Sequence, residues 1–150
     1  MTMPRCALAV IVLLLSVASV QADEARGAGR VKVASGAAFI VRDGRPAPAA
    51  PGHLVLQADV LRTGPDGRLG VTLNDDTRIS LGPASEVRLD RFSYASADGG
   101  LQLVLKFVRG VAAYVSGRIA KLSPDAVRLE TPAAIVGVRG TTLAIRVDEQ

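Results

Sequence analysis

RLGVTLNDDTRISLGPASEVRL, residues 68–89, places apolar side chains at every second position of three short runs. This alternation is typical of β-strands that bury one face. Asn-Asp-Asp at 74–76 and Gly-Pro at 82–83 separate the runs, and these residue types favour tight turns. The stretch therefore predicts three strands joined by turns, with these side chains facing a core: Leu69, Val71, Leu73, Ile79, Leu81, Val87 and Leu89.

The same pattern continues toward the C-terminus. Further alternating runs occupy residues 101–107, 111–115, 127–129 and 143–147. Many short strands, with turn signals roughly every eight to twelve residues, indicate an all-β domain. The near-regular turn spacing over residues 66–89 favours the successive coils of a β-solenoid, and a β-sandwich is the alternative.

Helical and linker segments are sparse. The best helix candidate is Val115–Leu122, but Gly117 interrupts it and the residues before it alternate as in a strand. The Pro- and Ala-rich segment Arg45–Gly52 is too short for a domain linker and predicts a loop between early strands. A single domain of many short strands is therefore expected.

Residues 1–22 have the pattern of a secretory signal peptide. Arg5 precedes an apolar run at residues 7–20, and small residues ending at Ala22 predict cleavage before Asp23. The run is shorter than the roughly 20 residues that a membrane-spanning helix needs. The expected organisation is a signal peptide at 1–22, a flexible lead-in at 23–28 and a β domain at 29–150. The protein is expected to be periplasmic or secreted, and not membrane-spanning after cleavage.

The composition left after cleavage excludes several classes of protein. Cleavage would leave 17 Lys and Arg against 14 Asp and Glu, a net charge of +3 compared with +4 for the whole chain. These charges are spread out and lack interleaved aromatic residues, so no nucleic-acid partner is expected. Cys6, the single cysteine, would leave with the signal peptide. Stability is therefore expected from packing and strand pairing, without disulfides or thiolate metal sites.

Side chains suited to catalysis are few and lack partners. His53 is the single histidine and stands beside a proline-rich loop, so a loop residue is expected there and not a general base. No serine stands in a G-x-S-x-G setting. Asp75-Asp76 lack the spacing of a calcium loop, and residues 137–141 lack the G-K-S/T ending of a phosphate loop. The sequence predicts no enzyme, no metal site and no cofactor.

The stretch TPAAIVGVRGTTLAIRV, residues 131–147, sets one arginine between two glycines. Thr131-Pro132 is expected to end one strand, because proline withholds a donor from the strand ladder. Gly137 and Gly140 permit a bend or a close backbone approach. The stretch predicts two strands joined through a glycine-flanked bend.

Arg139 has two alternatives at this bend. Its side chain either points into solvent or turns inward to bond nearby carbonyls and a carboxylate, for which Glu130 is one candidate. A guanidinium carries five donors in a fixed fork and can tie several loops together. We expect the inward orientation and a structural role.

These residues also resemble the signature that closes the FecR domain. The resemblance rests on Thr131-Pro132 followed by VGVRGT at residues 136–141 and then an alternating strand. It implies that these residues form a structural motif: Thr131, Pro132, Gly137, Arg139, Gly140 and Thr141.

Other segments are similar to the FecR family in the same order, from about Gly29 to Val147. Residues 31–42 resemble its opening hairpin, and residues 103–110 its L-x-x-G strand end. QADVLRTG at 57–64 resembles its Gly-Asp-x-hydrophobic-x-Thr-Gly step, with Ala58 where glycine is usual. Residues 73–83 resemble its Asp-Gly-Thr … Pro turns, with Asp76 in place of the glycine.

The resemblance implies a non-catalytic β module in the periplasm that binds or senses an envelope protein or polymer. The family's best-known members are iron-signalling regulators with a cytoplasmic segment that binds a sigma factor. No such segment is recognisable here, so the anti-sigma role is not carried over.

Two other functions compete with this one. A glycan- or lipopolysaccharide-binding module would use arginines on strand surfaces, and a solvated face protected against aggregation is the simpler interpretation of the same residues. An enzyme is the remote third possibility. The arginines concerned are Arg42, Arg45, Arg62, Arg68, Arg78, Arg88, Arg91 and Arg128.

The signal-peptide pattern predicts that the native protein begins at Asp23. Mass spectrometry of the intact protein from a periplasmic fraction should give the mass of residues 23–150. Retention of Met1, with the protein in the membrane pellet, would contradict this prediction.

Overall fold

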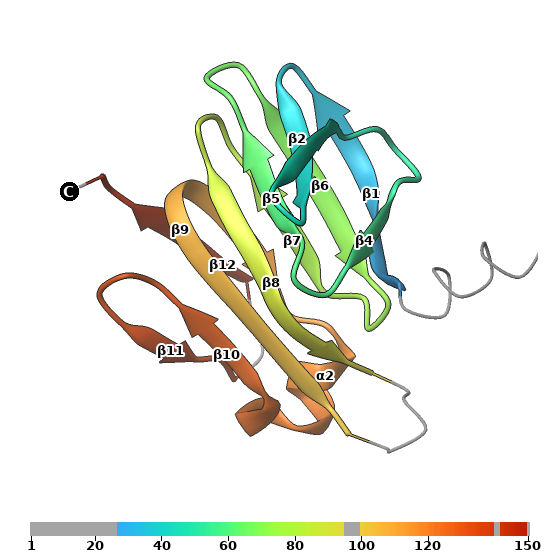
Figure 1. Cartoon of the computed structure of the whole chain (residues 1–150). Helices are drawn as coiled ribbons and strands as arrows, with labels where there is room; N and C mark the ends of the chain where they lie inside the picture. Colours follow the sequence, from blue (N-terminus) through green and yellow to red (C-terminus); the bar gives the residue numbers. More distant parts are fainter. Residues whose placement is uncertain (1–26, 95–99, 140–141, 150) are drawn as a thin grey trace, which may run out of the picture.

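The computed structural model of the chain describes residues 27–94, 100–139 and 142–149 (Figure 1). The strands are β1 (Gly27–Ser35), β2 (Ala38–Arg42), β3 (Arg45–Pro48), β4 (Leu54–Leu56), β5 (Val60–Thr63), β6 (Arg68–Leu73), β7 (Arg78–Leu81), β8 (Glu86–Ser93), β9 (Gln102–Val115), β10 (Val127–Glu130), β11 (Ile135–Gly137) and β12 (Thr142–Val147). A short helix α2 (Arg118–Leu122) and a 3-10 turn η1 (Pro124–Ala126) lie between β9 and β10. The all-β prediction is confirmed.

Four segments can be compared with the sequence expectations. The predicted signal peptide, with its cleavage site at Ala22 and Asp23, lies outside the described residues. β1 begins at Gly27, two residues before the expected start of the β domain. Arg45–Pro48, expected to be a loop, forms β3 instead, because its backbone pairs with β2 across a tight turn. α2 begins only after Gly117, so five residues of the helix candidate are helical.

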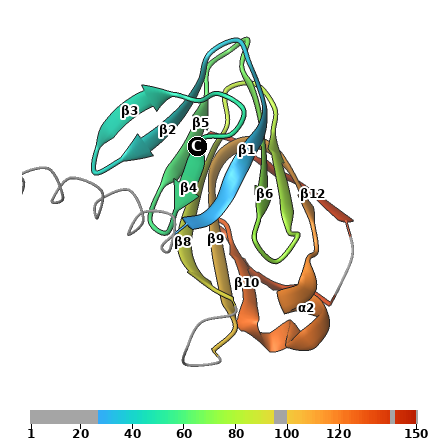
Figure 2. The ribbon, with the colours of Figure 1, turned by 90° about the vertical axis from the view of Figure 1, so that its right-hand side faces the viewer.

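The described strands form one 12-stranded sheet that curls into an open half-barrel (Figure 2). One side, here called half-sheet I, contains β4, β1, β6, β7, the second half of β9, and β12. The other side, half-sheet II, contains β3, β2, β5, β8, the first half of β9, β10 and β11. β9 belongs to both sides, and Figure 1 shows it arching from one to the other.

The strand pairing does not confirm a solenoid. Stacked coils of a β-solenoid pair in parallel, whereas every pair here is antiparallel except β9 with β10. The regular turn spacing reflects successive antiparallel strands instead. A sandwich of two separate sheets is not shown either, because the two half-sheets are continuous through β9.

The core lies inside the curl and joins both half-sheets. Leu69 and Tyr114 from half-sheet I belong to the same buried cluster as Leu105 and Phe107 from half-sheet II. All seven apolar positions predicted in residues 68–89 are buried. Burial of a side chain of this size contributes roughly 1.5–3 kcal/mol each. The cluster therefore stabilises the curled arrangement and not a flat sheet.

The sheet changes direction along one line, here called the corner. The chain crosses it at residues 36–37, 64–67, 82–85 and 110. Backbone bonds join these crossings: the Gly64 N–H donates to the Ala37 carbonyl at 2.8 Å, and the Ala84 N–H donates to the Gly64 carbonyl at 2.9 Å. The Gly82 N–H likewise donates to the Val111 carbonyl at 2.9 Å. The crossings thus form one bonded row.

Two glycines allow the backbones to meet at the corner. A Cβ on Gly67 would lie 2.0 Å from the Ala37 carbonyl oxygen. A Cβ on Gly110, whose φ is +83°, would lie 2.3 Å from Ser85 Oγ and 2.6 Å from the Ala84 carbonyl oxygen. Real carbon atoms do not approach these oxygens so closely, so both positions require glycine.

Thr63 and Ser85 satisfy the polar groups of the corner. Both side chains are buried, and the Thr63 hydroxyl donates to the Gly82 carbonyl at 2.6 Å while accepting from the Ser85 N–H at 2.9 Å. The Ser85 hydroxyl accepts from the Val111 N–H at 2.8 Å. Because strand ladders are broken where a sheet bends, these hydroxyls replace the missing backbone partners.

The corner predicts a large cost for a side chain at residue 110. Gly110→Ala should lower the free energy of unfolding by about 2–5 kcal/mol, since it adds overpacking to the cost of a left-handed backbone. Gly44→Ala is the matched control, because its φ is +75° and no atom lies within 4 Å of the added carbon. It should cost only about 1–2 kcal/mol. Equal losses in urea unfolding would show that contact at the corner is unimportant.

Candidate functional site: the closing hairpin

His53 and Asp76, two side chains with groups suited to catalysis, have separate partners in the structure. His53 is exposed in a loop, where its Nδ1 accepts from the Ala50 N–H at 3.2 Å. Asp76 is exposed and pairs with Arg118 at 3.0 Å. The described residues contain no group of His, Cys, Asp or Glu suited to hold a metal ion. They also contain no helix of sufficient length and apolar character to cross a membrane.

Asp75 is buried and ties α2 to the β6–β7 turn. Its carboxylate accepts from the Thr77 N–H at 3.1 Å, the Thr77 hydroxyl at 2.7 Å and the Ile119 N–H at 3.3 Å. Its carbonyl accepts from the Arg118 N–H at 2.7 Å. The predicted turn is confirmed, and the carboxylate also has a structural role that the spacing did not reveal.

Asp59 is a second buried carboxylate, with only 1 % of its surface exposed. Arg42 binds it through two bonds, from Nε to Oδ1 at 2.9 Å and from Nη2 to Oδ2 at 2.8 Å. The Leu56 N–H donates to Oδ2 at 2.8 Å. A two-bond fork of this kind is among the strongest side-chain interactions. Asp59 stands two residues before the buried Leu61, and residues two apart in an extended segment face the same side. This spacing is the sequence signal that could have identified Asp59 as buried.

Of the eight arginines proposed for anion binding, six lie on strands of half-sheet II, and Arg68 and Arg78 lie on half-sheet I. Four of them pair with carboxylates, and these pairs are Arg42 with Asp59, Arg62 with Glu86, Arg88 with Asp90, and Arg128 with Glu130. The hydrogen bond and charge of Asp90 raise the pKa of the Arg88 guanidinium further above its usual value. The charges of these four arginines on half-sheet II are therefore compensated by neighbouring carboxylates.

Thr131 and Pro132 form the turn of the β10–β11 hairpin. The Thr131 N–H donates to the Ala134 carbonyl at 2.8 Å, and the Thr131 hydroxyl accepts from the Ala134 N–H at 3.0 Å. Thr131-Pro132 therefore follows the end of β10, as predicted. Gly137 ends β11 and has open space around it. Gly140 and Thr141, the last two residues of the predicted motif, lie outside the described residues.

The inward orientation expected for Arg139 is wrong. Its side chain is exposed, and Glu130 pairs with Arg128 at 3.8 Å. The physical reason is that β11 pairs only with β10 among the described strands, so little structure surrounds the bend. The neighbouring Val138 is buried instead and anchors this segment to the core.

β11 is an exposed apolar edge. All three of its residues are exposed, and Ile135 exposes 67 % of its surface. Val136 is also among the exposed large apolar side chains of the described chain. An apolar edge strand of this kind is usually protected against pairing with other chains. Its exposure marks the hairpin as a candidate binding surface.

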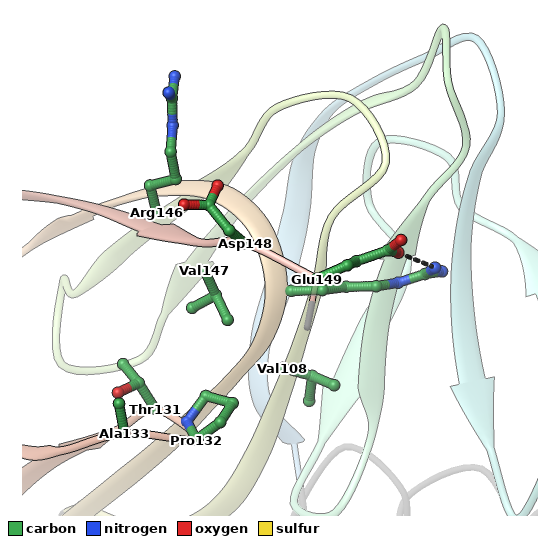
Figure 3. A pocket seen from close by; sticks show the side chains of 9 residues that line it. Val108, Thr131, Pro132, Ala133, Arg146, Val147, Asp148 and Glu149 are labelled. Atoms are coloured by element: carbon green, nitrogen blue, oxygen red, sulfur yellow. Dashed lines mark hydrogen bonds and ion pairs between the residues drawn. The ribbon is translucent and has the colours of Figure 1, made fainter.

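A groove of about 590 Å³ lies beside the turn of this hairpin. Figure 3 shows Val108, Pro132 and Val147 around the hollow, from β9, the hairpin turn and β12. Arg109 and Glu149 close one side with a bond of 3.4 Å. Arg109 also lies 3.7 Å from Glu86, so its charge is compensated. The groove suits an apolar side chain better than an anion.

The curled sheet and the exposed hairpin define a small all-β module with an exposed apolar edge. The chain belongs to the FecR family, since the family described as FecR protein matches residues 59–150, which is more than half of its length. The match covers the sheet from Asp59 onward and includes the closing hairpin. No curated protein and no solved structure matches the chain. The family is one of regulatory and sensing proteins.

The structure predicts opposite outcomes for two arginines. Arg42→Ala should lower the free energy of unfolding by about 2–3 kcal/mol, because it leaves the Asp59 carboxylate buried without its main partner. Arg139→Ala should change it by less than about 0.5 kcal/mol, as expected for an exposed side chain. Thermal and urea unfolding measure both. A larger loss for Arg139→Ala than for Arg42→Ala would restore the structural role first expected for Arg139.

Proposed function

We propose that this protein is a non-catalytic binding or sensing module of the bacterial envelope that recognises another protein through its β10–β11 hairpin. Family membership supports a regulatory or sensing role. The signal-peptide pattern of residues 1–22 supports export, and the partner is then an envelope protein.

The observation that carries the proposal is the unpaired edge of β11. Within the described residues β11 pairs with β10 alone, and it presents three exposed residues in succession. β3, another edge strand, contains Pro46 and Pro48, which withhold two donors and block pairing. β11 has no proline, lysine or bulge. An extended segment of a partner can add to such an edge through backbone bonds.

The partner segment is expected to be extended and to carry apolar side chains. Added beside β11, it would cover Ile135, and burial of that side chain contributes roughly 1.5–3 kcal/mol. The groove around Val108, Pro132 and Val147 lies beside the turn of the same hairpin and can take an apolar side chain of the partner. Arg139, exposed after β11, favours a carboxylate in the partner near the end of the added strand.

Site-specific cross-linking in intact cells tests this proposal. A photo-reactive residue at position 136 should capture a defined protein, and adding Ile135→Asp should remove the product, because an aspartate opposes burial in the new interface. Val33→Asp is the matched control, since Val33 is an exposed valine on half-sheet I with 58 % of its surface accessible. The cross-link should survive that change.

Two results would count against the proposal. One is an undiminished cross-linked product in the Ile135→Asp variant when circular dichroism shows that the variant is folded. The other is equal loss in the Val33→Asp variant, which would assign the effect to the stability of the domain.

A further inference from the structure

The strands of half-sheet I carry cations and no carboxylates. Their sequences, including the second half of β9, contain no Asp or Glu. Half-sheet II, in contrast, carries Glu86, Asp90 and Glu130 beside its arginines. The cations on the strands of half-sheet I are Arg30, Lys32, Arg68, Arg78 and Arg146.

Three of these arginines share the outward face of half-sheet I. Arg68 precedes buried Leu69, and Arg78 precedes buried Ile79. Arg146 lies between Ile145 and Val147, which pack against the core. Because successive side chains of a strand point to opposite faces, the three arginines point away from the core. All three are exposed.

The strand register places these arginines around a shallow surface. Gly70, Ser80, Ala113 and Ala144 lie opposite one another across β6, β7, β9 and β12. Neighbouring strands lie about 4.8 Å apart, so this row of small residues is about 14 Å long.

The arginines lie on both sides of that row. Arg68 and Arg146 are each two residues from it in one direction, and Arg78 is two residues from it in the other. Two residues of a strand span about 6.6 Å, so the cations face each other across about 13 Å of shallow surface.

The charge of this face is not compensated on its own strands. No ion pair between described residues involves Arg68, Arg78 or Arg146. The nearest carboxylates in sequence stand at strand ends. Asp66 accepts from the Ala37 N–H at the corner, Asp76 pairs with Arg118, and Asp148 follows β12.

We propose that the outward face of half-sheet I binds an extended acidic polysaccharide. Sulfate, phosphate and carboxylate groups along such a chain would pair with Arg68, Arg78 and Arg146, and guanidinium groups bind these anions through paired bonds. The small side chains between the arginines leave room for the sugar backbone. Long-range attraction to a face whose strands carry arginines and no carboxylate also favours capture of a polyanion.

The composition of the face favours a polysaccharide over two other polyanions. Bases of single-stranded nucleic acid stack on aromatic side chains, and membrane-surface segments insert aromatic or leucine side chains. This face has neither. Phe39, Phe92 and Tyr94 belong to half-sheet II or its loop, whereas Phe107 and Tyr114 are buried in the core.

This face does not include the β11 edge of half-sheet II, although Arg146 also lines the groove beside the hairpin turn. Heparin binding and the cross-link at position 136 therefore test the two proposals by separate measurements. Heparin is the probe, and affinity is measured with purified protein at several salt concentrations. The triple variant Arg68→Gln, Arg78→Gln, Arg146→Gln should bind heparin at least about 30-fold more weakly. The slope of the logarithm of the association constant against the logarithm of the salt concentration should become shallower by about two to three.

The matched control removes the same charge from the other half-sheet. The triple variant Arg62→Gln, Arg88→Gln, Arg128→Gln has the same net charge and should keep heparin affinity within about threefold, because those arginines already pair with carboxylates. Circular dichroism and thermal unfolding establish that both variants are folded.

Several outcomes would overturn the proposal. One is the absence of heparin binding by the unmodified protein, and another is equal weakening of heparin binding in the two triple variants. A third is unchanged heparin binding in the variant that replaces Arg68, Arg78 and Arg146. Binding to duplex DNA or to vesicles of anionic lipid as tightly as to heparin would overturn the assignment to a polysaccharide. Retention by dextran sulfate but not by neutral dextran would support it.

Discussion

The bonded row of backbone at the corner is the constraint on which the rest of the structure depends. Gly67 lies against Ala37, and Gly110 lies against Ser85, at distances that leave no room for a side chain. Since the neighbouring strands all turn along the same line, the two half-sheets face a common core. The Thr63 and Ser85 hydroxyls satisfy the backbone groups that a bend would otherwise leave unpaired. Sterics and hydrogen bonding thus fix the position of the bend together.

The buried polar groups among the described residues stabilise the fold. Asp59 joins Arg42 to the end of β4, and Asp75 joins α2 to the β6–β7 turn. A carboxylate held by several donors is costly to move or to leave unpaired. These residues therefore hold two connections of the sheet in place. That arrangement agrees with a family of regulatory and sensing proteins.

The two half-sheets present different surfaces because their charges are arranged differently. On half-sheet II, arginines lie beside glutamates and aspartates, which leaves the exposed β11 edge as its distinctive feature. On half-sheet I, arginines surround small side chains without a carboxylate on the same strands. We therefore propose the edge as a site for an extended peptide and the face as a site for a polyanion.

The sequence by itself determined the all-β class, most of the strands from residue 68 onward and the buried apolar side chains of residues 68–89. Alternation predicted the seven core positions of residues 68–89, and the motif around Thr131-Pro132 predicted the family. It could not determine the direction of pairing, because period-two alternation is the same in parallel and antiparallel strands. The solenoid expectation is not confirmed for that reason.

Only the tertiary structure decided the roles of individual charged side chains. Arg139 and Arg42 are the same residue type on strand-rich segments, but one lies exposed at an open edge and the other binds a buried aspartate. A guanidinium takes its role from whichever acceptors lie within about 3 Å, and residues far apart in sequence supply them. Arg42 and Asp59 meet because β2 pairs with β5, and that pairing exists only in the folded sheet.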